Sequence, residues 1–202
     1  MLVTALAVGL TQLAGGASSE ARTASVQSAG PPLQTAIGTY SVFARAAAPA
    51  DDVSGWRIHE DRAGLGLRFS DARVVYSDSV RTVAAVPASD GPCLLAQYKD
   101  GSGGFNCGGP NRVSASLGYN GALLLVPDSV QTVTYTMTDG TTQMSPVANN
   151  VAHSPVEAAK VAFTLGERTV QLDLMPRSSL PKGATLTEDG MVTGGSTPGY
   201  GG

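Results

Sequence analysis

The sequence predicts a mainly β protein, a small antiparallel β-sandwich or a sheet-rich single domain with short helical turns. Charged residues make up only 14% of the 202-residue chain. Gly, Ser, Thr, Ala and Val are abundant, and this balance favours short strands and turns over long helices. Several segments alternate apolar and polar residues with the period of two that is typical of a strand with one buried face. Two pairs of such segments flank short turn sequences, so we expect β-hairpins.

The chain begins with an apolar leader. Residues 1–17 carry no charged side chain, which predicts a signal peptide or an N-terminal membrane segment, with a buried N-terminal helix as the alternative. Residues 18–36 are rich in Ser, Ala, Gly and Pro, which predicts a flexible stalk. We expect the β-rich domain at residues 37–178 and a disordered Gly/Ser/Thr-rich tail at residues 179–202.

The first half of the expected domain contains one helical turn and three strands. Pro49 and the acidic residues after it favour a short helical turn. Strands are expected from Arg73 to Tyr76, from Arg81 to Val86 and from Cys93 to Tyr98.

Cys93 and Cys107 flank a loop with a flexible Gly-rich tip, so the two ends can return to one another. We expect a disulfide between them, with free structural thiols or a metal or redox site as the alternatives. Closing a loop of about 15 residues stabilises a fold by roughly 3 kcal/mol, and disulfides persist in oxidising compartments. The pair therefore supports an extracytoplasmic location, either secreted or anchored to the membrane by the leader.

The clearest hairpin lies in the second half of the chain. Its first arm alternates apolar residues with a row of threonines, and the second follows Asp139-Gly140. A two-residue type I′ turn there predicts Met144 opposite Tyr135 and Thr142 opposite Met137. The threonines then form an outward stripe: Thr132, Thr134, Thr136 and Thr138.

A second hairpin is expected around Gly166-Glu167, a type II′ turn that sets Phe163 against Val170 and Val161 against Leu172. Between the hairpins, Ser154-Pro155-Val156-Glu157 has the pattern of a capping box and predicts a short helix that continues to Lys160.

Two features are candidates for binding. Trp56 is the sole tryptophan and has the polar neighbours Arg57 and His59, although core packing is the commoner role of an indole. The stripe Thr132, Thr134 and Thr136 offers a flat outward face to a partner or polymer, although such a stripe is more often ordinary solvated sheet.

No segment carries a complete catalytic or cofactor motif. His59, Glu60 and Asp61 combine an imidazole with two carboxylates, but consecutive residues of a strand point to opposite faces. The Gly-x-Ser-x-Gly, His-Glu-x-x-His, P-loop and EF-hand patterns are absent. We therefore assign no catalytic residue, no metal and no cofactor. The net charge is -3 and the basic residues are scattered, so nucleic acid is not an expected partner.

Three groups of motifs follow one another in a characteristic order. Tyr40-Ser41-Val42-Phe43-Ala44-Arg45 precedes the Cys93/Cys107 pair, and Leu125-Val126-Pro127-Asp128-Ser129-Val130 leads to Asp139-Gly140 and Pro146-Val147-Ala148-Asn149-Asn150. Together they resemble a group of uncharacterised actinobacterial extracytoplasmic proteins, over roughly residues 40–151. Ala46-Ala47-Ala48 and Ser129 depart from the pattern of the group. The resemblance implies export and a β-rich fold, and it implies no activity.

From these observations we expect a non-catalytic extracytoplasmic binding or structural module, with a cell-envelope protein or polymer as its partner. Two alternatives stay open. One is a hydrolase of cell-envelope material with His59 or His153 as its base, and the other is a sensory ectodomain held in the membrane by residues 1–17.

Overall fold

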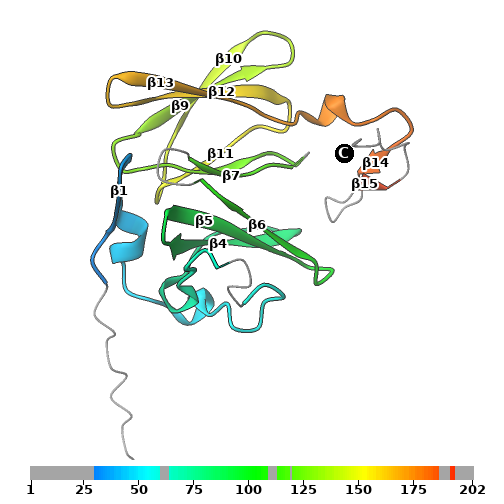
Figure 1. The fold of residues 1–202 in the computed structure, drawn as a ribbon. Coiled ribbons are helices and arrows are strands. Elements are labelled where there is room, and N and C mark those ends of the chain that lie inside the picture. The colour runs from blue at the N-terminus through cyan, green and yellow to red at the C-terminus, as the bar shows by residue number, and fades with distance from the viewer. Residues whose placement is uncertain (1–29, 60–63, 109–112, 119, 187–191, 194–202) are drawn as a thin grey trace, which may run out of the picture.

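Three antiparallel sheets lie one above another and form the body of the protein (Figure 1). The computed structural model describes residues 30–59, 64–108, 113–118, 120–186 and 192–193. Within these residues the secondary structure is strand, turn and short 3-10 helix, so the expected mainly β fold is confirmed. Of the two expected arrangements, the structure takes the sheet-rich one, with three layers instead of the two of a sandwich.

Each layer consists of antiparallel strands. The lower sheet, in spatial order, contains β3 (Arg73–Ser77), β4 (Arg81–Ala88), β5 (Gly91–Tyr98) and β6 (Gly103–Cys107). The middle sheet contains β11 (Val151–His153), β8 (Leu123–Leu125) and β7 (Ser114–Ser116). The upper sheet contains β10 (Thr142–Pro146), β9 (Thr132–Met137), β12 (Ala158–Leu165) and β13 (Arg168–Asp173).

Smaller elements surround the three layers. Two short hairpins pair β1 (Leu33–Thr35) with β2 (Gly38–Tyr40), and β14 (Thr185–Leu186) with β15 (Val192–Thr193). The 3-10 helices are η1 (Ser41–Ala44), η2 (Pro49–Asp51), η3 (Phe69–Asp71) and η4 (Arg177–Ser179).

The middle sheet is covered on both faces. Leu123, Leu124 and Leu125 of β8 are all fully buried. Leu124 packs with Tyr135 and Val161 of the upper sheet, and its two neighbours pack with residues of the lower sheet, among them Val83. A strand buried on both faces needs apolar residues at every position, which explains the uninterrupted leucine run.

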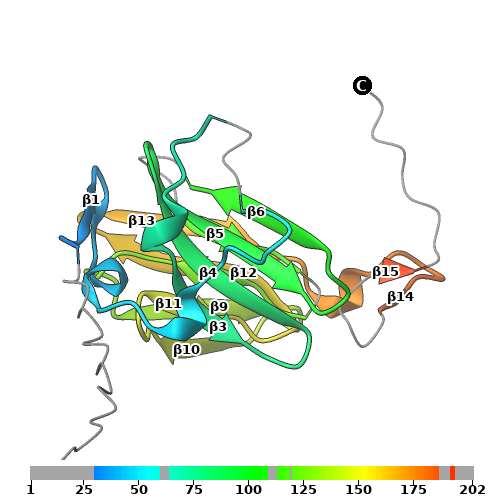
Figure 2. The same cartoon turned by 90° about the horizontal axis from the view of Figure 1, so that it is seen from below.

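The outer face of the lower sheet is covered by the irregular segment that contains η2 and η3. Val53 and Phe69 of this segment pack against Val86 and Leu95, which lie on that face. Figure 2 shows the segment lying across the strands of the lower sheet. The two faces of this sheet therefore contact different cores, and its inner face looks toward the middle sheet.

Several sequence-based expectations are confirmed residue by residue. The strands expected around Arg73, Arg81 and Cys93 are β3, β4 and β5, and the helical turn at Pro49 is η2. In the second hairpin Phe163 pairs with Val170 and Val161 pairs with Leu172, as expected. Gly166 at its turn has a φ of +57°.

The register of the first hairpin was predicted wrongly by one residue. Gln143, and not Met144, pairs with Tyr135, and Thr142 pairs with Thr136 instead of Met137. The loop has three residues, because the Met137 amide donates to the Thr141 carbonyl (2.8 Å) and the Gly140 amide donates to the Met137 carbonyl (3.0 Å). This turn places only Gly140 at positive φ (+84°), whereas a type I′ turn would also force Asp139 there.

Three further expectations differ from the structure. β1 begins at Leu33, inside the segment expected as a stalk, and β14 lies in the segment expected as a tail. The capping box at Ser154 does not start a helix, because the chain turns at Pro155 and enters β12 at Ala158. The Ser154 hydroxyl instead accepts a hydrogen bond from the Ala122 amide (2.8 Å) and so joins this turn to the middle sheet.

Candidate binding site

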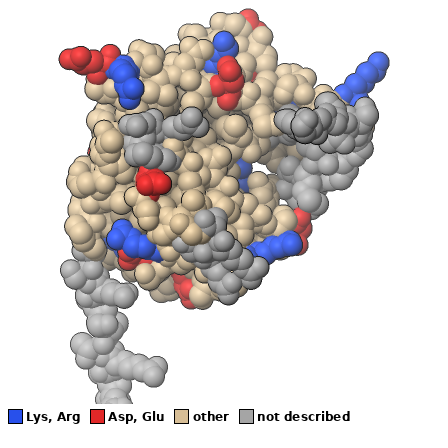
Figure 3. Space-filling model, viewed as in Figure 1, with Lys and Arg blue, Asp and Glu red and all other residues tan. Residues whose placement is uncertain are grey.

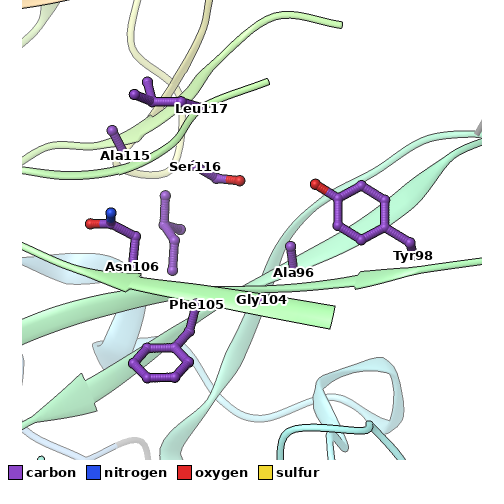
Figure 4. Close-up of a pocket in the computed structure, with 9 residues that line it drawn as sticks. Ala96, Tyr98, Gly104, Phe105, Asn106, Ala115, Ser116 and Leu117 are labelled. Atoms are coloured by element: carbon purple, nitrogen blue, oxygen red, sulfur yellow. The ribbon is translucent and has the colours of Figure 1, made fainter. Parts of the chain in front are cut away.

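A cavity of about 270 Å³ lies between the lower and middle sheets. β5 and β6 form its floor and β7 forms its roof, and it is lined by Leu94, Ala96, Tyr98, Gly104, Phe105, Asn106, Ala115, Ser116 and Leu117 (Figure 4). Both β6 and β7 are edge strands of their sheets in the described part of the chain. The cavity therefore opens where the edges of two stacked sheets lie over one another.

Ser114 joins the two sheets at one end of the cavity. Its hydroxyl donates to the Pro92 carbonyl and accepts a hydrogen bond from the Gly108 amide (2.9 Å), and the residue is fully buried. Ala115, Ser116 and Leu117 line the cavity directly after this serine. Ser114 thus sets the distance between β7 and the strands β5 and β6 at this end of the cavity.

The floor of the cavity is apolar and its rim is polar. Leu94 and Ala96 are buried and belong to the core between the two sheets. In Figure 4 the side chain of Asn106 points up toward β7, and the hydroxyls of Ser116 and Tyr98 point toward one another across the opening. Phe105 points the other way, out of the cavity. Apolar walls with a few convergent polar groups are typical of ligand sites in proteins.

The Cys93–Cys107 disulfide stabilises this floor. The two cysteines pair directly across β5 and β6 and are bonded to one another, so the expected disulfide is confirmed. Its presence is compatible with an oxidising, extracytoplasmic compartment.

Removing this bond should lower the stability of the folded protein. Changing both cysteines to alanine is expected to reduce the free energy of unfolding by about 3 kcal/mol, because the unfolded chain regains the entropy of an open loop. Urea unfolding of both proteins with and without a reductant would measure this. Reductant should destabilise the natural protein and leave the double variant unchanged. Equal curves for all four samples would contradict the prediction.

A cluster of four polar side chains, which we call the Arg81 cluster, lies beyond the Tyr98 end of the cavity. It contains Tyr76, Asp78, Arg81 and His153. Arg81 pairs with Tyr98 across β4 and β5, so both side chains lie on the face that looks toward the middle sheet. The Arg81 guanidinium donates to the Gly121 carbonyl (3.0 Å) and lies 5.9 Å from the centre of the Tyr76 ring. The Tyr76 and His153 rings are 5.0 Å apart.

Arg81 affects the protonation of His153. Burial is the largest influence on the pKa of this imidazole and lowers it, and the positive charge of Arg81 lowers it further. The carbonyl of Asn120 and the carboxylate of Asp78 act in the opposite direction without reversing the shift. His153 is therefore mainly neutral at neutral pH, and Arg81 supplies the permanent positive charge of the cluster.

Charged side chains on the visible face of the molecule are scattered. Figure 3 shows basic and acidic residues distributed singly or in mixed pairs over this face, and a recess with a basic side chain in its wall. A concentrated basic surface, which phosphate backbones require, is not present on the face shown.

The structure separates the two binding candidates that the sequence indicated. Trp56 is half-buried and packs on the outer face of the lower sheet, away from the cavity. Thr132 is exposed and Thr134 and Thr136 are partly exposed on the outer face of the upper sheet. They lie on opposite outer layers, so they do not form one site, and a binding role for either stays a prediction.

The described contacts of the two histidines are with backbone groups and, for His153, with side chains of the Arg81 cluster. The His59 Nδ1 atom lies 2.7 Å from the Trp56 carbonyl oxygen. The hydroxyl of Ser154, next to His153, contacts the Ala122 amide and the Pro155 carbonyl. Glu60 and Asp61 lie outside the described residues.

Comparisons with protein-family models, curated proteins and solved structures gave no match. The function is therefore inferred from the positions and contacts of the described residues. Among the described residues, no helix has the length and apolar character that crossing a membrane requires, and no three His, Cys, Asp or Glu side chains are grouped as metal ligands. The expected leader, residues 1–17, lies outside the described part of the chain.

Three segments distant in sequence, around Ser41, Asp128 and Asn150, meet at a second polar cluster. Asn150 accepts a hydrogen bond from the Val42 amide (2.8 Å) and donates to the Val126 carbonyl (3.0 Å) and to Asp128 (2.7 Å). Asp128 also accepts from the Ser41 hydroxyl (2.7 Å). These bonds join η1 to the loops that follow β8 and precede β11. The cluster thus has a clear architectural role.

Proposed function

We propose that this protein is a non-catalytic binding module that acts outside the cytoplasm and takes part of a cell-envelope molecule into the cavity between β5, β6 and β7. The observation that carries the proposal is the position of the cavity, between the edges of two sheets that are otherwise closely packed. Its apolar floor offers a place for an apolar group, and the side chains of Tyr98, Asn106 and Ser116 offer hydrogen bonds at the rim.

The surroundings of His153 favour binding over hydrolysis. A general base needs a nucleophile or a water-activating carboxylate within hydrogen-bond reach. The described neighbours of His153 are the Tyr76 ring, the Arg81 guanidinium, the Asn120 carbonyl and the Asp78 carboxylate. The carboxylate accepts hydrogen bonds from the backbone amides of Val80 and Arg81, so it holds its own turn. The disulfide supports a location outside the cytoplasm.

Filling the cavity tests the proposal. A Cβ atom added at Gly104 meets no heavy atom within 4 Å, so Gly104→Phe should fold and occupy the space with its ring. We expect the natural protein to bind the neutral apolar fluorophore N-phenyl-1-naphthylamine and the variant to bind it at least about tenfold more weakly. Fluorescence titration measures both affinities.

Gly55→Phe is the matched control. Gly55 also has open space around its Cβ position and lies in an exposed loop, so the same side chain is added away from the cavity. This variant should bind the fluorophore like the natural protein. Equal binding by the natural protein and Gly104→Phe, or no binding by either, would contradict the proposed function.

A further inference from the structure

We propose that the ligand of the cavity is an amphiphilic carboxylate, with its apolar chain between the two sheets and its carboxylate group on Arg81. This inference rests on the proposed function, because it names the chemical class of the molecule that the same cavity takes.

Arg81 is not one of the residues that line the cavity, but it lies next to residues that do. Its pairing partner Tyr98 lines the cavity. On the roof, Leu117 lines the cavity and the next residue is Gly118, where an added Cβ atom would lie 3.6 Å from Arg81 Nη1. Arg81 therefore lies beside the end of the cavity that Tyr98 and Leu117 form.

The guanidinium has hydrogen-bonding capacity that the protein does not use. Arg81 is only 3% exposed. Within the described residues its guanidinium donates one hydrogen bond, from Nη2 to the Gly121 carbonyl, and no carboxylate lies within 4 Å of its nitrogens. A buried cation without an anionic partner is costly, and the ring of Tyr76 compensates for part of this cost.

The nearest acidic group does not supply the missing partner. Asp78 Oδ1 accepts hydrogen bonds from the backbone amides of Val80 and Arg81, both 2.7 Å long. The Tyr76 hydroxyl also acts on Asp78 and is one of the groups that lower the pKa of this carboxyl. The carboxylate is therefore directed to these groups, and it influences the guanidinium only from a distance.

A single positive charge matches a singly charged carboxylate better than it matches a doubly charged phosphate. Arginine binds a carboxylate with two parallel hydrogen bonds. The other basic group of the cluster, His153, is mainly neutral for the reasons given above. The rest of the ligand must be apolar because it lies over Leu94, Ala96 and Gly104.

Competition with the bound fluorophore by decanoate and decan-1-ol tests this assignment. The two probes share the alkyl chain and differ in the charged end. The natural protein should bind decanoate at least about tenfold more tightly, because a hydrogen bond to a charged group has about this effect. Octanoate should bind about fourfold more weakly for each missing methylene.

Two variants separate the effect of the positive charge of Arg81 from the effect of its planar shape. Arg81→Met should lose the preference for decanoate over decan-1-ol. Arg81→Lys keeps the charge without the planar fork and should retain a reduced preference. Thermal unfolding of each variant confirms folding.

The outcomes distinguish this inference from the proposed function. If the natural protein binds the fluorophore but shows no preference for decanoate, the role of Arg81 is wrong and the function of the cavity stands. A preference that persists in Arg81→Met would also overturn it. If the fluorophore does not bind, or binds Gly104→Phe equally well, the proposed function fails first.

Discussion

Asp51→Ala is expected to lower the free energy of unfolding by about 4 kcal/mol, because it removes a buried carboxylate and leaves its hydrogen-bond donors without an acceptor. The Asp51 side chain is 4% exposed. Its carboxylate accepts two hydrogen bonds from Arg45 (2.6 and 2.7 Å), one from the Ala48 amide and one from the Val74 amide (both 2.7 Å). It therefore attaches η2 to β3 at the edge of the lower sheet. Urea unfolding measures the loss.

Asp52→Ala is the control for this substitution. The Asp52 side chain is exposed and accepts a hydrogen bond from the Ser54 amide (2.9 Å), so its removal should leave the unfolding curve close to that of the natural protein. If Asp51→Ala and Asp52→Ala are equally stable, the Asp51 carboxylate does not hold this segment.

The same carboxylate makes the stability depend on pH. Burial alone would raise the pKa of Asp51, but the hydrogen bonds from Arg45, Ala48 and Val74 outweigh it and lower the pKa from the usual value of 3.8. The ionised form is thus favoured in the folded state. The stabilisation is fully present above pH 4 and is lost as the pH falls from about 3.8 through the folded pKa. Asp51→Ala should flatten this part of the stability curve.

Local patterns in the sequence predicted the strands well, and the arrangement of the sheets poorly. Alternation and turn residues are properties of neighbouring positions, so β3, β4, β5 and the register of the β12–β13 hairpin could be derived. The third layer could not. The run Leu123-Leu124-Leu125 was the available signal, because a strand that is apolar at every position needs a sheet on each face.

The hairpin at Asp139-Gly140 shows how a local rule can fail. Both a two-residue and a three-residue loop place Gly140 at positive φ, and the sequence allows either. The two-residue loop has the more regular apolar pairing, with Met144 toward the core. In the structure β10 is an edge strand and Met144 is 69% exposed on the outer face, so burial does not enforce that pairing.

The candidate binding site was not predictable from local patterns because it is built by segments distant in sequence. Tyr98 and Asn106 come from the lower sheet, whereas Ser116 comes from the middle one. One signal was present. Arg81 opens an otherwise largely apolar strand, β4, and its side chain lies on the same face as Val83 and Ala85, toward the middle sheet. A charge at an inward position of such a strand indicates a functional site or a specific structural partner.

Asn150→Gly is expected to lower the free energy of unfolding by about 3 kcal/mol. Asn150 is buried and has a φ of +65°, a conformation that glycine adopts freely. The substitution therefore leaves the backbone unstrained and removes only the carboxamide. The Val42 amide and the Val126 carbonyl then lose their partners, and each unsatisfied buried group costs about 1–3 kcal/mol.

The neighbouring residue provides a control with the same backbone requirement. Asn149 has a φ of +50° and an exposed side chain, so Asn149→Gly should change the free energy of unfolding by less than about 0.5 kcal/mol.

Asn150→Asp tests the hydrogen bonds in a second way, because it keeps the shape of the side chain and places a carboxylate against Asp128. In the natural protein the hydrogen bonds from Ser41 and Asn150 outweigh the effect of burial and lower the pKa of Asp128. The variant replaces one of these donors with a second carboxylate, so the two groups would repel one another at neutral pH. Urea unfolding at pH 7 should rank Asn150→Asp as the least stable of the three variants. Equal stability of Asn149→Gly and Asn150→Gly would show that the carboxamide does not join η1 to the middle sheet.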